Sequence, residues 1–150
     1  MTEHQHTSSR PGESAAFHFE TTWWIQAEEE RVWEVLSDIS SWSDWWPGIS
    51  RSHRVGEQAS MVVRSPLGYS LRFTLDLVEA DAPRSARFTV DGDLRGVGSF
   101  TGAQEEGCTR VQIMWCVVTR RRLVSFLRPL ARWAHAVVMK AGQRGLRRVI

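Results

Sequence analysis

The chain is poor in cysteine: its 150 residues include only Cys108 and Cys116. Both fall in one predicted strand, where an extended backbone at about 3.3 Å per residue holds them roughly 26 Å apart. That separation excludes a disulfide between them, and the lack of a Cys-x-x-Cys pair argues against a zinc site. We therefore expect two free thiols, as in a reducing compartment.

Histidines that could bind a metal are also few. His4 and His6 are close in sequence, but they lie in residues 1–14, a polar segment rich in Ser, Thr, Pro and Gly. This composition predicts a disordered tail, and a mobile tail does not hold metal ligands in place. We expect no metal site and no cofactor.

Long apolar runs and common catalytic motifs are missing as well. No run approaches the roughly 18 apolar residues that a membrane-spanning helix needs, and the N-terminal residues carry no hydrophobic signal segment. We therefore expect a cytoplasmic protein. A dinucleotide-binding Gly-x-Gly-x-x-Gly, a P-loop, a Gly-x-Ser-x-Gly and a His-Glu-x-x-His are all absent, which argues against nucleotide-binding, serine hydrolase and zinc protease classes.

Negative charge is absent from the last part of the chain. All 17 acidic residues precede Gly107 together with nine basic ones, a net charge of −8, whereas ten basic residues and no acid follow, a net charge of +10. Such asymmetry accompanies binding to nucleic acid or to an anionic membrane. Because the arginines are interleaved with Leu, Val and Trp, we expect no nucleic acid. Docking on an anionic membrane or on an acidic partner stays an alternative.

Tryptophan is present in excess, with eight Trp against one Tyr, which is Tyr69. Indole rings are large and apolar, so their number predicts a bulky core or a wall for an apolar ligand. A chain of this length fits one domain that buries about 70% of its unfolded surface. We assign residues 15–150 to that domain.

Alternating apolar and polar residues predict a run of strands joined by short turns. The first strand, residues 16–25, precedes two short helices at 27–38 and 40–46. Further strands are predicted at 49–55, 59–64, 69–80, around 86–90, at 94–101 and around 111–117. Alternation in successive strands predicts one curved antiparallel sheet of six to seven strands with a single apolar face.

A long amphipathic helix is predicted at the end of the chain, over residues 123–148. Pro129 implies a kink or a start nearer residue 128. The middle of the apolar arc consists of small residues, which let a helix approach its neighbour closely or leave room beside it: Ala131, Ala134, Ala141, Gly142 and Gly145. Because only this helix is long enough to cover the apolar face, the sheet must curl around it in an α+β fold.

This order resembles the helix-grip fold of the START-related (SRPBCC) superfamily of lipid-binding proteins and polyketide cyclases. The first helix ends in Ser37-Asp38 and leads to a Trp-x-x-Trp-Trp-Pro stretch, residues 42–47, which looks like that superfamily's early segment. Residues 132–146 look more specifically like bacterial polyketide cyclase/dehydrase members, which tend to carry Asn-His-Asp there. In this chain Ala134 and Ala136 flank His135 instead, so an acidic catalytic partner at that place is missing.

The resemblance implies an elongated apolar cavity between sheet and helix, open at one end. Burial at about 25 cal/mol per Å² would drive binding of a lipid, isoprenoid or polyketide-like molecule there. We expect its walls to come from the apolar face of the sheet and from the helix: Tyr69, Phe73, Leu75, Phe88, Val90, Phe100, Ile113, Trp115, Leu127, Leu130, Ala131, Ala134 and Val138.

His135 lies at the edge of the apolar arc and is the candidate catalytic residue, as a general acid/base. The alternative is a boundary histidine that binds a backbone group or water. Three functions follow: a binder of a hydrophobic small molecule, a cyclase/aromatase enzyme that uses His135, or a module that docks through its basic helix. A second polar group converging on His135 would favour the enzyme, and a wholly apolar cavity would favour the binder.

Overall fold

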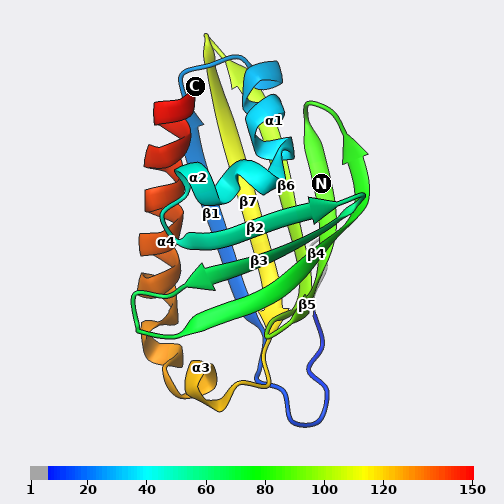
Figure 1. Cartoon of the computed structure of the whole chain (residues 1–150), viewed down its shortest axis with the longest axis vertical. Coiled ribbons are helices and arrows are strands. Elements are labelled where there is room, and N and C mark those ends of the chain that lie inside the picture. Colours follow the sequence, from blue (N-terminus) through cyan, green and yellow to red (C-terminus); the bar gives the residue numbers. More distant parts are fainter. Residues whose placement is uncertain (1–6) are drawn as a thin grey trace.

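Seven antiparallel strands form one sheet that curls around a long C-terminal helix in the computed structural model, which describes residues 7–150 (Figure 1). His4 and His6 lie outside the described residues. The strands are β1 Phe17–Ile25, β2 Ile49–Val55, β3 Gln58–Arg64, β4 Ser70–Asp81, β5 Ser85–Gly92, β6 Arg95–Glu105 and β7 Cys108–Val118. The predicted α+β helix-grip fold is confirmed.

The strand order is β1-β7-β6-β5-β4-β3-β2, so every neighbouring pair except β1 and β7 is a hairpin. β1 pairs antiparallel with β7 from Phe17 opposite Val117 to Ile25 opposite Thr109. This pairing brings the aromatic residues of the first strand beside the last strand. In Figure 1, β2, β3 and β4 cross in front of β1, β7 and β6, and the inner face of the sheet is therefore concave.

Short helices between β1 and β2 cover the upper end of the sheet in Figure 1. They are α1 Glu29–Ser37, the 3-10 turn η1 Ile39–Ser41 and α2 Trp42–Trp45. α1 buries Val32 and Leu36, and the two acidic residues in its first turn favour the helix dipole. Trp45 of α2 and the following Trp46 are both buried.

The predicted C-terminal helix is divided in two by a break at Leu127. α3 spans Arg122–Phe126 and α4 spans Arg128–Val149. Pro129 lies in the first turn of α4, where its missing N–H leaves no hydrogen bond unmade. The structure thus confirms the start near residue 128 that Pro129 implied.

Two glycines hold the second half of α4 against α2 and the residues that follow it. A Cβ at Gly142 would lie 2.4 Å from Cε2 of Trp46, and a Cβ at Gly145 would lie 1.7 Å from the carbonyl oxygen of Trp45. The close approach also lets the Trp46 indole donate a hydrogen bond to the Val138 carbonyl oxygen at 2.8 Å. Only glycine permits this packing distance.

Residues 7–14 belong to the segment predicted as a tail, and the structure places them against β6 and β7. The Thr7 hydroxyl donates to the Cys116 carbonyl oxygen at 2.7 Å, and Glu13 forms an ion pair with Arg95 at 2.8 Å. Cys116 is buried and Cys108 half-buried, and both are free thiols.

Candidate functional site

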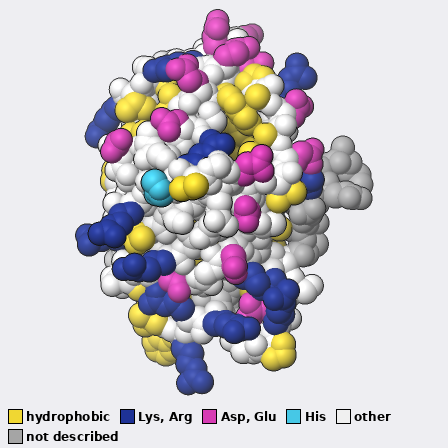
Figure 2. Space-filling view, turned by 45° about the vertical axis from the view of Figure 1, so that its right-hand side comes forward, with side chains coloured by type: hydrophobic (Ala, Val, Ile, Leu, Met, Phe, Trp, Pro, Cys, Tyr) yellow, Lys and Arg dark blue, Asp and Glu magenta, His cyan; other side chains and the backbone are white. Residues whose placement is uncertain are grey.

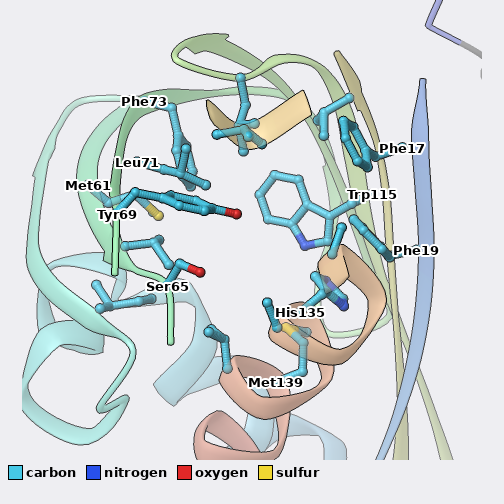
Figure 3. A pocket seen from close by; sticks show the side chains of 18 of the residues that line it. Phe17, Phe19, Met61, Ser65, Tyr69, Leu71, Phe73, Trp115, His135 and Met139 are labelled. Atoms are coloured by element: carbon cyan, nitrogen blue, oxygen red, sulfur yellow. The ribbon is translucent and has the colours of Figure 1, made fainter. Parts of the chain in front are cut away.

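A cavity of about 140 Å³, partly open to solvent, lies between the inner face of the sheet and the first half of α4 (Figure 3). β1, β3, β4 and β7 supply one side of its wall, and α3 and α4 supply another. Its lining is almost wholly apolar: Phe17, Phe19, Trp42, Trp46, Ile49, Met61, Val63, Ser65, Tyr69, Leu71, Phe73, Leu94, Trp115, Val117, Val124, Ala131, Ala134, His135, Val138 and Met139.

The cavity exists because α4 faces the sheet with small residues at this point. Gly142 and Gly145 fix the second half of the helix against α2. In its first half the helix faces the middle of the cavity with the methyl groups of Ala131 and Ala134, while the His135 ring packs to one side on Phe19 of β1. Methyl groups are too short to fill the gap between a straight helix and a curved sheet, so a void remains.

Several of the predicted wall residues line this cavity. They come from both layers: Tyr69, Phe73, Trp115, Ala131, Ala134, Val138 and His135. Tyr69 is held at the rim by Arg121, whose guanidinium carbon lies 5.8 Å from the ring centre. Arg121 also donates a hydrogen bond to the Ser70 carbonyl oxygen, and so connects the start of α3 to the turn between β3 and β4.

Other predicted sheet residues lie on the inner face but not in the cavity wall. Leu75 and Val90 are almost completely buried in the core, and Ile113 packs against that core. The Phe100 ring lies 5.9 Å from the Trp33 ring of α1, and the Phe88 ring lies 5.5 Å from the Trp115 ring. The sheet is longer than the cavity, and helix packing and aromatic contacts fill the rest of its inner face.

Two predicted helix residues are also outside the wall. Leu130 is 47% exposed, because the glycines direct the face of Ala131 and Ala134 toward the sheet. One residue corresponds to about 100° around a helix, which turns Leu130 toward solvent. Leu127 lies at the break between α3 and α4 and is half-buried. The hydrophobic pattern of the helix therefore predicts an inward face that is rotated too far toward the large apolar residues.

Wall residues that the sequence analysis did not single out come mainly from elements distant in sequence. Phe17 and Phe19 of β1 alternate with polar residues, so their inward direction could have been predicted, whereas Met61 of β3 is followed by two valines and has no such pattern. Their place in the cavity depends on the pairing of β1 with β7, for which the sequence carries no local signal. Trp46 reaches the cavity through its contact with Gly142.

His135 is the most unusual polar group of the wall. Its ring stacks on the Phe19 ring, with 4.2 Å between centres and planes 10° apart. Burial lowers its pKa to about 4, because the charged imidazolium would lose its hydration. Nε2 is buried without a hydrogen-bond partner among the described residues. At neutral pH this side chain is thus an uncharged imidazole with one unused polar atom.

Two hydroxyl groups face His135 from the opposite wall. In Figure 3 the Tyr69 and Ser65 hydroxyls both point into the middle of the cavity, and the His135 ring lies across it beside Phe19. Ser65 Oγ accepts a hydrogen bond from the Leu67 amide at 3.1 Å and still has its own proton to donate. An apolar cavity with a few converging polar groups is the usual form of a small-molecule site.

Residues 7–150 contain neither a cluster of metal ligands nor a membrane-spanning helix. No three His, Cys, Asp or Glu side chains of these residues gather as metal ligands would. No helix among them combines the length and the apolar character that crossing a membrane requires.

Residues 16–150 match the family described as polyketide cyclase/dehydrase and lipid transport. Among solved structures, the fold is similar to protein TTHA0849 from Thermus thermophilus, with 21% identity, a TM-score of 0.74 and coverage of 87% of this chain and 94% of that one. No curated protein matches the sequence.

Two further solved structures have the same fold. The Zhui aromatase/cyclase from Streptomyces sp. R1128 has 16% identity and a TM-score of 0.74, with coverage of 88% of this chain and 92% of that one. A START superfamily protein from Mycobacterium smegmatis has 15% identity and a TM-score of 0.71, with coverage of 87% and 94%. At these identities the likeness concerns the fold alone.

Proposed function

We propose, given that the chain belongs to the polyketide cyclase/dehydrase and lipid transport family, that its cavity binds a hydrophobic small molecule with an aromatic ring. The observation that carries this proposal is the apolar void under Ala131 and Ala134. Aromatic rings from several elements surround it, including Phe19, Phe73 and Trp115, and such rings favour stacked or edge-on contacts with another ring.

The size of the void limits what enters without rearrangement. A dry apolar cavity of about 150 Å³ holds a molecule the size of benzene, so about 140 Å³ accommodates one ring. A longer lipid, isoprenoid or polyketide-like ligand extends through the open side or displaces flexible wall residues. Met61 and Met139 are suited to this, because methionine adapts its shape at low cost.

The energetics favour the longer ligand. An aromatic ring buries roughly 150–250 Å², and at about 25 cal/mol per Å² this contributes about 4–6 kcal/mol. Loss of translational and rotational freedom offsets most or all of that gain. Tight binding therefore needs apolar surface beyond one ring.

The test compares two matched substitutions in α4 with the apolar fluorescent probe N-phenyl-1-naphthylamine. Ala134→Trp places an indole in the void, and we expect it to abolish probe binding while the protein stays folded. Ala136→Trp adds the same indole on the exposed side of the helix and should leave binding unchanged. Equal probe affinity in Ala134→Trp and the wild type would mean that the cavity is not the binding site.

A second candidate function is a cyclase that promotes aldol closure or dehydration of a bound polyketide. The presence of the Tyr69 and Ser65 hydroxyls and of His135 in the wall of one cavity favours it (Figure 3). With a pKa of about 4, His135 is a weak base, because proton transfer is most efficient near the working pH. We therefore assign it the role of hydrogen-bond partner to a ligand carbonyl or hydroxyl, and we rank the binder first.

Turnover separates the two functions. A cyclase would convert a poly-β-carbonyl thioester to an aromatic product, which absorbs in the near ultraviolet. His135→Ala and Tyr69→Phe should then reduce this rate strongly while probe binding changes little. A pure binder gives no product with the wild type, and His135→Ala again leaves probe binding nearly intact.

A further inference from the structure

A second apolar surface lies on the outer side of α3 and of the first half of α4. We call it the outer stripe, and its members are all exposed: Leu123, Phe126, Leu130, Trp133 and Val137. Phe126 is 81% exposed and Trp133 55% exposed. Large apolar side chains gathered in this way on a surface mark a site of interaction.

The outer stripe follows helical geometry. Leu130, Trp133 and Val137 are spaced i, i+3 and i+7 along α4, which places them on one face. Ala131 and Ala134, over the cavity, lie on the adjoining face. The apolar arc of the first half of α4 is therefore wider than the part that the sheet covers, and an apolar helix face is normally covered. The outer stripe is the part of this arc that stays exposed.

Positive charge surrounds the outer stripe. Arg122, Arg132 and Lys140 flank it, and none of the three forms an ion pair with a described acidic residue. No acidic residue follows Glu106 in the sequence. At the lower end of the molecule, where α3 lies in Figure 1, dark blue and yellow side chains stand next to one another in Figure 2. The covering partner must be negatively charged as well as apolar.

We propose that the outer stripe docks on the surface of an anionic lipid bilayer. Trp and Phe side chains suit the boundary between headgroups and acyl chains, and arginines beside them reach lipid phosphates. A second copy of this chain is a poor partner, because a two-fold contact would place Arg122, Arg132 and Lys140 near their own equivalents. The apolar and cationic parts together match one surface, that of the bilayer.

α3 connects this surface to the cavity. Its Val124 is buried in the cavity wall, whereas Leu123 and Phe126 of the same turn are exposed. A docked molecule therefore holds its cavity beside the bilayer, where an apolar ligand is dissolved. The docking itself does not depend on the proposed ligand, and it can be tested with vesicles alone.

The experiment is flotation of the full chain with vesicles in about 0.1 M salt. Vesicles of phosphatidylcholine and phosphatidylglycerol at 7:3 should bind at least tenfold more protein than vesicles of phosphatidylcholine alone. The double variant Phe126→Ser/Trp133→Ser and the double variant Arg122→Glu/Arg132→Glu should each lose at least tenfold in binding. Higher salt should weaken the wild type, since the charge contribution is screened.

Matched controls use exposed residues outside the outer stripe. Trp24→Ser/Val78→Ser removes comparable exposed apolar side chains and should bind vesicles like the wild type. Unfolding curves of all variants should coincide, because every substituted side chain is at the surface.

Three kinds of outcome would overturn the proposal. The first is a flotation result without specificity: the wild-type protein floats with neither vesicle, or the control loses as much as the outer-stripe variants. The second is a dimer by light scattering that Phe126→Ser/Trp133→Ser dissociates, which would assign the outer stripe to a second copy. The third is binding to soluble polyglutamate as tight as to anionic vesicles, which would assign it to an acidic protein.

Discussion

Both halves of α4 face their neighbours with small residues, but one half is closely packed and the other borders a cavity. In the second half, Gly142 and Gly145 let the helix contact Trp46 and the backbone of Trp45. In the first half, Ala131 and Ala134 face the sheet across a cavity. What differs is the neighbour: aromatic residues after α1 reach the helix at one end, whereas at the other end the sheet curves away. Small residues permit close packing, but the opposite element decides whether it occurs.

The packed half should be the more sensitive to added volume. Gly145→Ala places a methyl group 1.7 Å from the Trp45 carbonyl oxygen, and this backbone atom cannot move without shifting α2. Overpacking of this kind costs about 3 kcal/mol or more, against about 1 kcal/mol gained from the helix propensity of alanine. We expect the free energy of unfolding, measured in urea, to fall by at least about 2 kcal/mol.

A matched substitution in the first half serves as the control. Ala131→Val adds methyl groups next to the cavity, where space is available, and should change the free energy of unfolding by less than about 1 kcal/mol. If Gly145→Ala were as mild as Ala131→Val, the two halves would not differ in packing, and the glycines would not define the position of the helix.

Most of this difference in packing between the two halves of α4 could not be predicted from the sequence. Periodicity predicts the strands and the long helix, and Pro129 predicts a start of α4 near residue 128, because these depend on neighbours along the chain. It also supplied the inward residues Phe73 and Trp115. The rotation of α4 about its axis depends on contacts of Gly142 and Gly145 with Trp46 and Trp45, which come from a distant segment. Periodicity alone therefore predicts Leu130 in the cavity wall, although it lies at the exposed edge of the apolar arc.

The loosely packed half also contains the buried titratable group. The pKa of His135 is about 4, lowered from 6.5 by burial. Between pH 6.5 and 4 the unfolded chain takes up a proton at this imidazole and the folded protein does not, so stability falls as the pH decreases through this window and levels off below it. At about 1.4 kcal/mol per pKa unit, the loss amounts to about 3 kcal/mol in total.

His135→Phe isolates this effect, since a phenyl ring keeps the stacking on Phe19 and does not titrate. Urea unfolding at pH 7, 6, 5 and 4 should show the wild type losing more stability than the variant across the window. Parallel pH curves for the two proteins would contradict the burial of His135. Carboxylates cancel in the comparison, because both proteins contain the same ones.

The smallest expected effect concerns the side of α4 that faces water. Leu130→Ser and Val138→Ser both replace an aliphatic side chain of one helix with serine. Leu130→Ser loses some helix propensity and Val138→Ser almost none, so propensity alone would make Leu130→Ser the more costly change. Leu130 is exposed, so Leu130→Ser should change the free energy of unfolding by no more than about 0.5 kcal/mol and leave affinity for the naphthylamine probe unchanged.

Val138 lines the cavity and abuts Gly48. Val138→Ser should therefore cost about 1–2 kcal/mol and weaken probe binding several-fold. Probe titrations that respond equally to both substitutions would mean that the helix presents a different face to the sheet, and the contrast between its two sides would then be lost.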